Sequence, residues 1–113
     1  MQRIPTSVLA AAAGLALMAS AATVMAQGGV PTVGQKDKQF SQEAVTVAAG
    51  GSVRFVNDDS VAHNVFARDP AGATRPGVLQ RPGEQADLAF ERPGDHQVLC
   101  AIHPRMRMTV KVQ

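Results

Sequence analysis

The chain has one cysteine, no tryptophan, no tyrosine and four phenylalanines in 113 residues. A single cysteine cannot form an intramolecular disulfide, and structural zinc modules need several Cys and His ligands, so disulfide-stapled mini-proteins and zinc fingers are excluded. The formal net charge is only +2, and basic and acidic residues are interspersed. The sequence therefore lacks the basic face that binding to nucleic acid requires. Its length suffices for one domain of ordinary size.

The first 26 residues have the composition of a secretory signal peptide. Arg3 supplies a charged start, residues 8–22 are apolar, and small residues precede a cleavage point before Gln27. An uncleaved membrane anchor is the alternative, because the apolar stretch approaches the length of a membrane span. We expect cleavage, so the sequence predicts an exported, periplasmic protein with no membrane span after removal of residues 1–26.

The rest of the chain is predicted to be a flexible tail, residues 27–39, followed by a single domain, residues 40–113. The tail is rich in Gly, Gln and Lys. From Phe40 onward, apolar and polar residues alternate with the period of a half-buried strand. Val45 and Val47 precede Gly50–Gly51, after which the alternation resumes, and this break predicts a hairpin.

Pro and Gly punctuate the segment from Arg68 to Gly83, which is expected to be mostly loop. At the C-terminus Met106, Met108, Val110 and Val112 share one parity, as in a half-buried closing strand. No window after residue 26 has the 3.6-residue apolar period of a helix. The fold class is therefore predicted to be all-β, a small antiparallel Greek-key sandwich or barrel.

Three metal-binding side chains lie within seven residues of one another, between two predicted strands. Cys100 offers a thiolate, His103 an imidazole and Met106 a thioether. A thiolate, imidazole and a weakly held thioether suit copper better than zinc or calcium. Export would also place an unpaired Cys in an oxidising compartment, where a thiol without a function is a liability. The sequence predicts one copper ion as the cofactor.

A trigonal copper site needs a second His, and His63 is the better candidate. It follows a polar turn, at the start of a predicted strand. His96 lies four residues before Cys100 in the same strand, about 13 Å away by strand rise, which is too far to share an ion with that sulfur. His96 is predicted to be a packed strand residue.

Two methionines compete for the axial position of this site. With Met106 as the ligand, six residues up to Val112 remain for the closing strand, whereas Met108 leaves a short one. We favour Met106, with Met108 in the core, and the choice stays open at this point.

Taken with these ligands, the sequence resembles the cupredoxins, the blue-copper fold of plastocyanin, azurin and amicyanin. The resemblance covers about residues 40–113. It rests on a first-half pattern and on a ligand loop of the amicyanin kind: Phe40, Val45, Val47, Gly50, Val53, Phe55, Asn57, Asp59 and His63-Asn64-Val65, then Pro93-Gly94 and Cys100-x2-His103-Pro104-x-Met106. The short spacing between His103 and Met106 favours Met106 over Met108.

The resemblance implies a type 1 copper protein that carries single electrons and is not an enzyme. His63, Cys100, His103 and Met106 would hold the copper, and His103 would be the edge where electrons enter and leave. The expected partners are redox proteins, a cytochrome c or a periplasmic dehydrogenase or oxidase, and the chain is expected to be a monomer. The Asn64 N–H is expected to donate to the Cys100 sulfur, and Ile102 keeps an N–H that could donate a second bond. The alternative function is periplasmic copper binding or delivery without electron transfer.

Overall fold

The computed structural model describes residues 29–113, so the predicted export segment, residues 1–26, lies outside the described residues. These residues form strands and no helix, and the predicted all-β class is confirmed. Within them, no helix has the length and apolar character needed to span a membrane. The strands are β1 (Thr32–Lys36), β2 (Gln39–Phe40), β3 (Ala44–Val47), β4 (Gly51–Asn57), β5 (His63–Arg68), β6 (Val78–Gln80), β7 (Gln85–Phe90), β8 (Gly94–Cys100) and β9 (Arg107–Val112).

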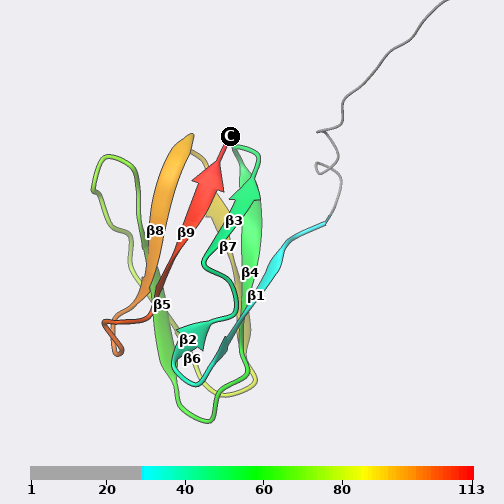
Figure 1. Cartoon of the computed structure of the whole chain (residues 1–113), viewed down its shortest axis with the longest axis vertical. Helices are drawn as coiled ribbons and strands as arrows, with labels where there is room; N and C mark the ends of the chain where they lie inside the picture. The colour runs from blue at the N-terminus through cyan, green and yellow to red at the C-terminus, as the bar shows by residue number, and fades with distance from the viewer. Residues whose placement is uncertain (1–28) are drawn as a thin grey trace, which may run out of the picture.

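The strands form two sheets that face each other as a sandwich, with β8 and β9 on one side and β4 and β1 on the other (Figure 1). The four-stranded sheet has the order β2-β1-β4-β7, and the five-stranded sheet has the order β3-β9-β8-β5-β6. Most neighbours are antiparallel, as predicted, but β1 pairs with β4 and β3 pairs with β9 in parallel. Both parallel pairs join strands that are distant in the sequence, so alternation along the chain carries no signal for them.

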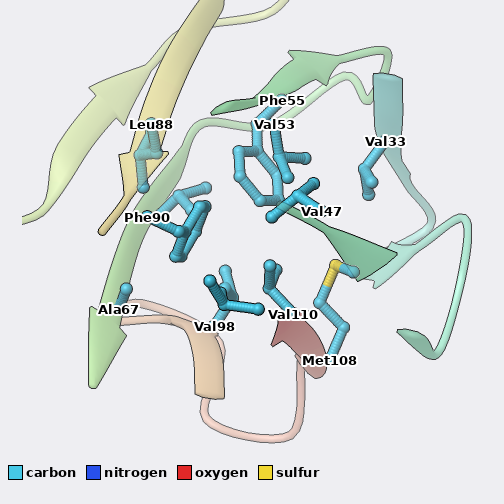
Figure 2. Close-up of a cluster of buried hydrophobic side chains, with 12 residues drawn as sticks. Val33, Val47, Val53, Phe55, Ala67, Leu88, Phe90, Val98, Met108 and Val110 are labelled. Carbon is cyan, nitrogen blue, oxygen red and sulfur yellow. The ribbon is translucent and has the colours of Figure 1, made fainter. Parts of the chain in front are cut away.

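Alternate residues of both sheets meet in one hydrophobic core, where Phe55 and Phe90 from one sheet point toward Val98 and Val110 from the other (Figure 2). Both phenylalanines are almost completely buried. Met108 belongs to this core, as expected. The core is built mainly from Val, whose β-branched side chain packs well on a pleated surface.

The prediction of a flexible tail up to residue 39 is wrong where the structure describes it. Residues 32–36 form β1, in which Val33 and Gln35 are fully buried, and residues 39–40 form β2. The prediction was wrong because β1 has a single apolar side chain facing inward, Val33, and its other inward side chain is polar. Alternation cannot be recognised when one of its two inward residues is Gln.

The predicted hairpin at Gly50–Gly51 is also wrong. β3 pairs with β9 in one sheet and β4 pairs with β1 and β7 in the other, so the glycines let the chain cross between sheets. Gly50 has a φ of 88°, a conformation that favours glycine, and its N–H donates to the carbonyl of Phe90. Both sheets bury alternate residues against the same core, so the period alone does not distinguish a hairpin from a crossing.

The segment from Arg68 to Gly83 is mostly loop, as predicted, but it contains the short strand β6. This strand extends the five-stranded sheet by pairing with β5, and its register sets His63 opposite Gln80. Pro and Gly on both sides hide β6 in the sequence. Its position matters because it places Gln80 next to His63.

Candidate metal centre

Three side chains that can bind a metal converge at one end of the five-stranded sheet. His63 is the first residue of β5, Cys100 is the last residue of β8, and His103 lies in the loop that leads to β9. β5 and β8 are antiparallel neighbours with Val65 opposite Cys100, so His63 and Cys100 face the same side of the sheet. His63 and Cys100 are buried, while His103 is only partly buried.

The three donor atoms form a compact triangle. His63 Nδ1 and His103 Nδ1 are 3.1 Å apart, and the Cys100 Sγ is 3.7 Å from each of them. The point equidistant from the three atoms lies about 2 Å from each, which is close to the length of a bond between an imidazole nitrogen and a first-row metal ion. A thiolate and two imidazoles at this spacing fit one copper ion.

Met106 is the other residue of this loop with a metal-binding side chain, and it is buried, with 2% of its surface exposed. Its N–H donates to the carbonyl of His103 and its carbonyl accepts from the N–H of Cys100. These bonds fold the loop so that residues 100, 103 and 106 stay together. Met108, two residues on, belongs instead to the hydrophobic core.

His96 lies apart from the cluster, as predicted. It is buried in β8, its ring packs edge-on against Phe90, and its Nε2 lies 2.7 Å from the carbonyl oxygen of Arg92. The contacts of the His96 ring are therefore with Phe90 and Arg92, and not with the residues of the cluster.

A carboxylate orients His63 from the side opposite the cluster. His63 Nε2 is 3.0 Å from Asp59 Oδ2, and the same carboxylate oxygen accepts the backbone N–H of Lys38. The Lys38 N–H first, and the His63 side chain next, lower the pKa of Asp59 far below its ordinary value. Because Asp59 accepts from Nε2, the nitrogen left to face Cys100 and His103 is Nδ1. A carboxylate on the outer nitrogen of a histidine fixes its tautomer and raises its basicity as a metal ligand.

The Lys38 N–H is held in place by a tight turn between β1 and β2. Asp37 and Lys38 have φ angles of 54° and 59°, which are rare for residues other than glycine and typical of a two-residue hairpin turn. The bond to Asp59 helps to offset the strain of this turn. Asp59 was not predicted as a functional residue; its position four residues before His63, at the end of a polar turn, was the available signal.

Backbone contacts hold the cysteine. The Asn64 N–H donates to Cys100 Sγ at 3.3 Å, as expected, and the Asn64 carbonyl accepts from the Ala101 N–H. A hydrogen bond to a thiolate stabilises its negative charge. Among the hydrogen bonds of the described residues, none runs from the Ile102 N–H to this sulfur, so the expected second donor is not present.

Two buried glutamines join the sheets next to His63. Gln35 of β1 donates through Nε2 to Gln80 Oε1 at 2.6 Å, and Gln80 donates to the carbonyl of Phe55. Asn57 donates to the carbonyls of Gln80 and Val61, which anchors the turn that leads into β5. The sequence does not reveal the role of these amides, since a polar residue in a strand gives no sign that it faces inward.

Burial and nearby charges act on the imidazole of His103. Partial burial first, and then the proximity of His63 and Lys38, lower the pKa of His103 below its ordinary value, although Asp59 acts in the opposite direction. The neutral imidazole, which is the form that binds a metal, is thereby favoured.

Comparison with known proteins decides the family. The model of copper binding proteins of the plastocyanin/azurin family matches residues 29–113, the whole of the described chain. The chain is a cupredoxin. Copper is therefore its cofactor, as the donor set of the cluster also indicates.

Relatives of this cupredoxin include plastocyanins and an amicyanin. It is 34% identical to a chloroplastic plastocyanin of Physcomitrium patens over 113 residues, which cover 91% of this chain and 64% of that protein. It is 33% identical to a chloroplastic plastocyanin of Tetradesmus obliquus, with coverage of 99% and 81%. It is 29% identical to amicyanin-alpha of Methylorubrum extorquens, with coverage of 91% and 88%.

Solved structures share the fold of this cupredoxin. A reduced Cu(I) form of an amicyanin variant superimposes with a TM-score of 0.68 at 24% identity, covering 76% of this chain and 84% of that chain. A purple cupredoxin from Nitrosopumilus maritimus gives a TM-score of 0.64 at 22% identity, covering 74% and 99%. At these identities the likeness concerns the fold alone.

Proposed function

We propose that this cupredoxin is an exported one-electron carrier with a type 1 copper site held by His63, Cys100, His103 and Met106. The triangle of Sγ and two Nδ1 atoms, with its centre about 2 Å from each, carries the proposal. Bound copper supplies a Cu(II)/Cu(I) couple that takes up and releases single electrons. Export, inferred from the sequence of residues 1–26, would place the carrier among periplasmic redox proteins such as a c-type cytochrome or a dehydrogenase.

The protein holds its donors through contacts that do not involve the ion. Asp59 orients His63, the Asn64 N–H holds Cys100, and the bonds between Met106, His103 and Cys100 fold the loop. Fixed donors need little rearrangement when the charge of the ion changes, so electron transfer can be fast. Met106 rather than Met108 would hold the copper, because Met108 packs in the core.

The burial of the donors also supports an electron carrier over a copper-delivery protein. His63 is fully buried and Cys100 is 2% exposed. A delivery protein must release copper to a partner, which requires donors that an incoming ligand can reach. His103 is the more accessible donor, and the exposed residues Ala101, Ile102 and Pro104 surround it in the sequence. This arrangement suits electron passage through the His103 ring.

The proposal is tested by adding Cu(II) to the purified protein freed of metal. We expect one equivalent to produce intense visible thiolate-to-copper charge-transfer absorption, and repeated reduction and oxidation to bleach and restore it without loss of copper. Rapid transfer of copper to an external chelator, with no reversible redox cycle, would instead identify a delivery protein.

A matched pair of variants tests the axial assignment. Met106→Leu removes the thioether and is expected to change the visible spectrum and raise the reduction potential, because a sulfur donor to Cu(II) is lost. Met108→Leu is expected to leave spectrum and potential unchanged and to cost less than about 1.5 kcal/mol of stability, as a volume-conserving core substitution. The reverse outcome would assign Met108.

A further inference from the structure

The outer surface of the five-stranded sheet carries large apolar side chains that the core does not use. Leu79 is 50% exposed, and Phe66 and Leu99 are partly exposed. None of the three belongs to the core cluster or packs against it. The solvent face of an antiparallel sheet is ordinarily polar, so a group of apolar residues there indicates a contact surface.

The strand register makes these residues one patch. Phe66 of β5 is opposite Leu99 of β8, and Leu79 of β6 is opposite Asn64 of β5, one step along the same outward row. Directly opposed residues of antiparallel strands have side chains on the same face and in contact range. We call this patch, formed by Phe66, Leu79 and Leu99, the outer patch.

The outer patch is continuous with the copper ligands. Leu99 and the exposed Ala101 flank Cys100, and the Ala101 N–H donates to the carbonyl of Asn64. Ile102, 50% exposed, follows at the start of the loop that carries His103. A protein covering the outer patch would therefore lie against both the cysteine strand and the loop of the partly exposed histidine.

Arginines border the outer patch. Arg107 is opposite Leu99, Arg68 is the outward residue two positions after Phe66, and Arg105 lies in the adjoining loop; all three are exposed. None of the three forms a salt bridge among the described residues. The exposed carboxylate of β8 belongs to Asp95, which is opposite Lys111 at the other end of the strand. Among the described residues, no salt bridge neutralises the positive charge beside the outer patch.

We propose that the outer patch and its arginines bind the redox partner, and that the partner presents an apolar surface bordered by carboxylates. The proposal rests on the electron-carrier function above and specifies the partner's chemistry. Apolar contact gives a short-lived complex its contact area, and opposite charges at the rim accelerate encounter and orient it. A second copy of this chain would place like charges against each other across such a contact, which disfavours self-association.

The test measures binding separately from electron transfer. The ¹⁵N-labelled Cu(I) protein is titrated with an acidic c-type cytochrome and, in parallel, with a basic one. We expect the acidic cytochrome to shift the amide signals of residues 64–68, 79, 97–102 and 105–107, and raising the ionic strength to weaken this binding. The basic cytochrome is expected to leave these signals in place.

Two matched pairs of variants locate the contact. Arg107→Glu should weaken binding of the acidic cytochrome about tenfold or more. Lys111→Glu makes the same change of charge on the same face of β9 and should have little effect. Leu79→Ser should weaken binding, whereas Val30→Ser, at a position 41% exposed outside the patch, should not.

The outcomes separate this proposal from the proposed function. Binding at the outer patch without electron transfer would overturn the carrier function and leave the docking surface standing. Electron transfer with shifts confined to other surfaces, or equal losses for Arg107→Glu and Lys111→Glu, would overturn the docking surface alone. Dimers in sedimentation, with the same amide shifts on self-titration, would assign the outer patch to a second copy instead.

Discussion

Cys100→Ser is expected to abolish the visible charge-transfer absorption of the copper-loaded protein completely. The absorption requires a thiolate bound to copper, and the chain has no other cysteine. Ser offers a hard, weakly acidic oxygen in place of a soft sulfur, so the affinity for copper should fall by at least about 100-fold. Absorption spectra and competition with a chelator of known affinity measure the two effects.

The Cys100→Ser variant should keep its fold, because the change in volume is small and the Asn64 N–H can donate to the serine oxygen as it does to Sγ. Thermal unfolding of both proteins without copper checks this. His96→Gln is the matched control for a side chain outside the cluster and should retain the full absorption. A coloured Cys100→Ser protein, or a colourless His96→Gln protein that remains folded, would contradict the assignment of the site.

Asp59→Asn is expected to raise the reduction potential of the copper by tens of millivolts. The carboxylate bonds to Nε2 of His63, one imidazole ring from the donor nitrogen, and its negative charge stabilises Cu(II) more than Cu(I). Asn keeps an oxygen that can accept the Lys38 and His63 hydrogen bonds. Its amide nitrogen cannot accept the Ser60 N–H that the other oxygen of Asp59 accepts, so one exposed bond is lost with the charge. Voltammetry of the two proteins at one pH measures the shift.

Asp58→Asn is the control for Asp59→Asn. It removes the same charge one residue away, from an exposed side chain that has no hydrogen bond with His63. Its potential should shift by much less, since water and salt screen an exposed charge. Equal shifts for the two variants would mean that Asp59 acts only through the net charge of the turn. An unchanged potential in Asp59→Asn would remove its role in tuning the copper.

The ligand loop was predictable because its geometry is local. Cys100, His103 and Met106 lie within seven residues, and a loop closed by backbone bonds keeps residues at that spacing together. The choice of His63 over His96 could also be made from the sequence, because the rise of an extended strand separates His96 from Cys100. Met108 shares its parity with Val110 and Val112, as a core residue should, but Met106 has the same parity, so closing-strand length and loop spacing separated the two methionines.

Several contacts that support the cluster were not predictable, since one partner of each comes from a distant segment. The Lys38 N–H that Asp59 accepts comes from the β1–β2 turn, and Gln35 reaches Gln80 because β1 and β6 lie in opposing sheets. A sequence states how residues alternate along a strand, and not which strand becomes its neighbour.

By itself, the sequence determined that this is an all-β cupredoxin-like chain with a donor-rich loop between its last two strands. The tertiary structure alone decided that residues 32–36 complete a sheet, that Gly50–Gly51 crosses between sheets, and that Phe66, Leu79 and Leu99 form one partly exposed patch. The physical reason is the same in each case. Periodicity and spacing are properties of a short stretch of backbone, whereas strand pairing is a property of contacts between segments far apart in the chain.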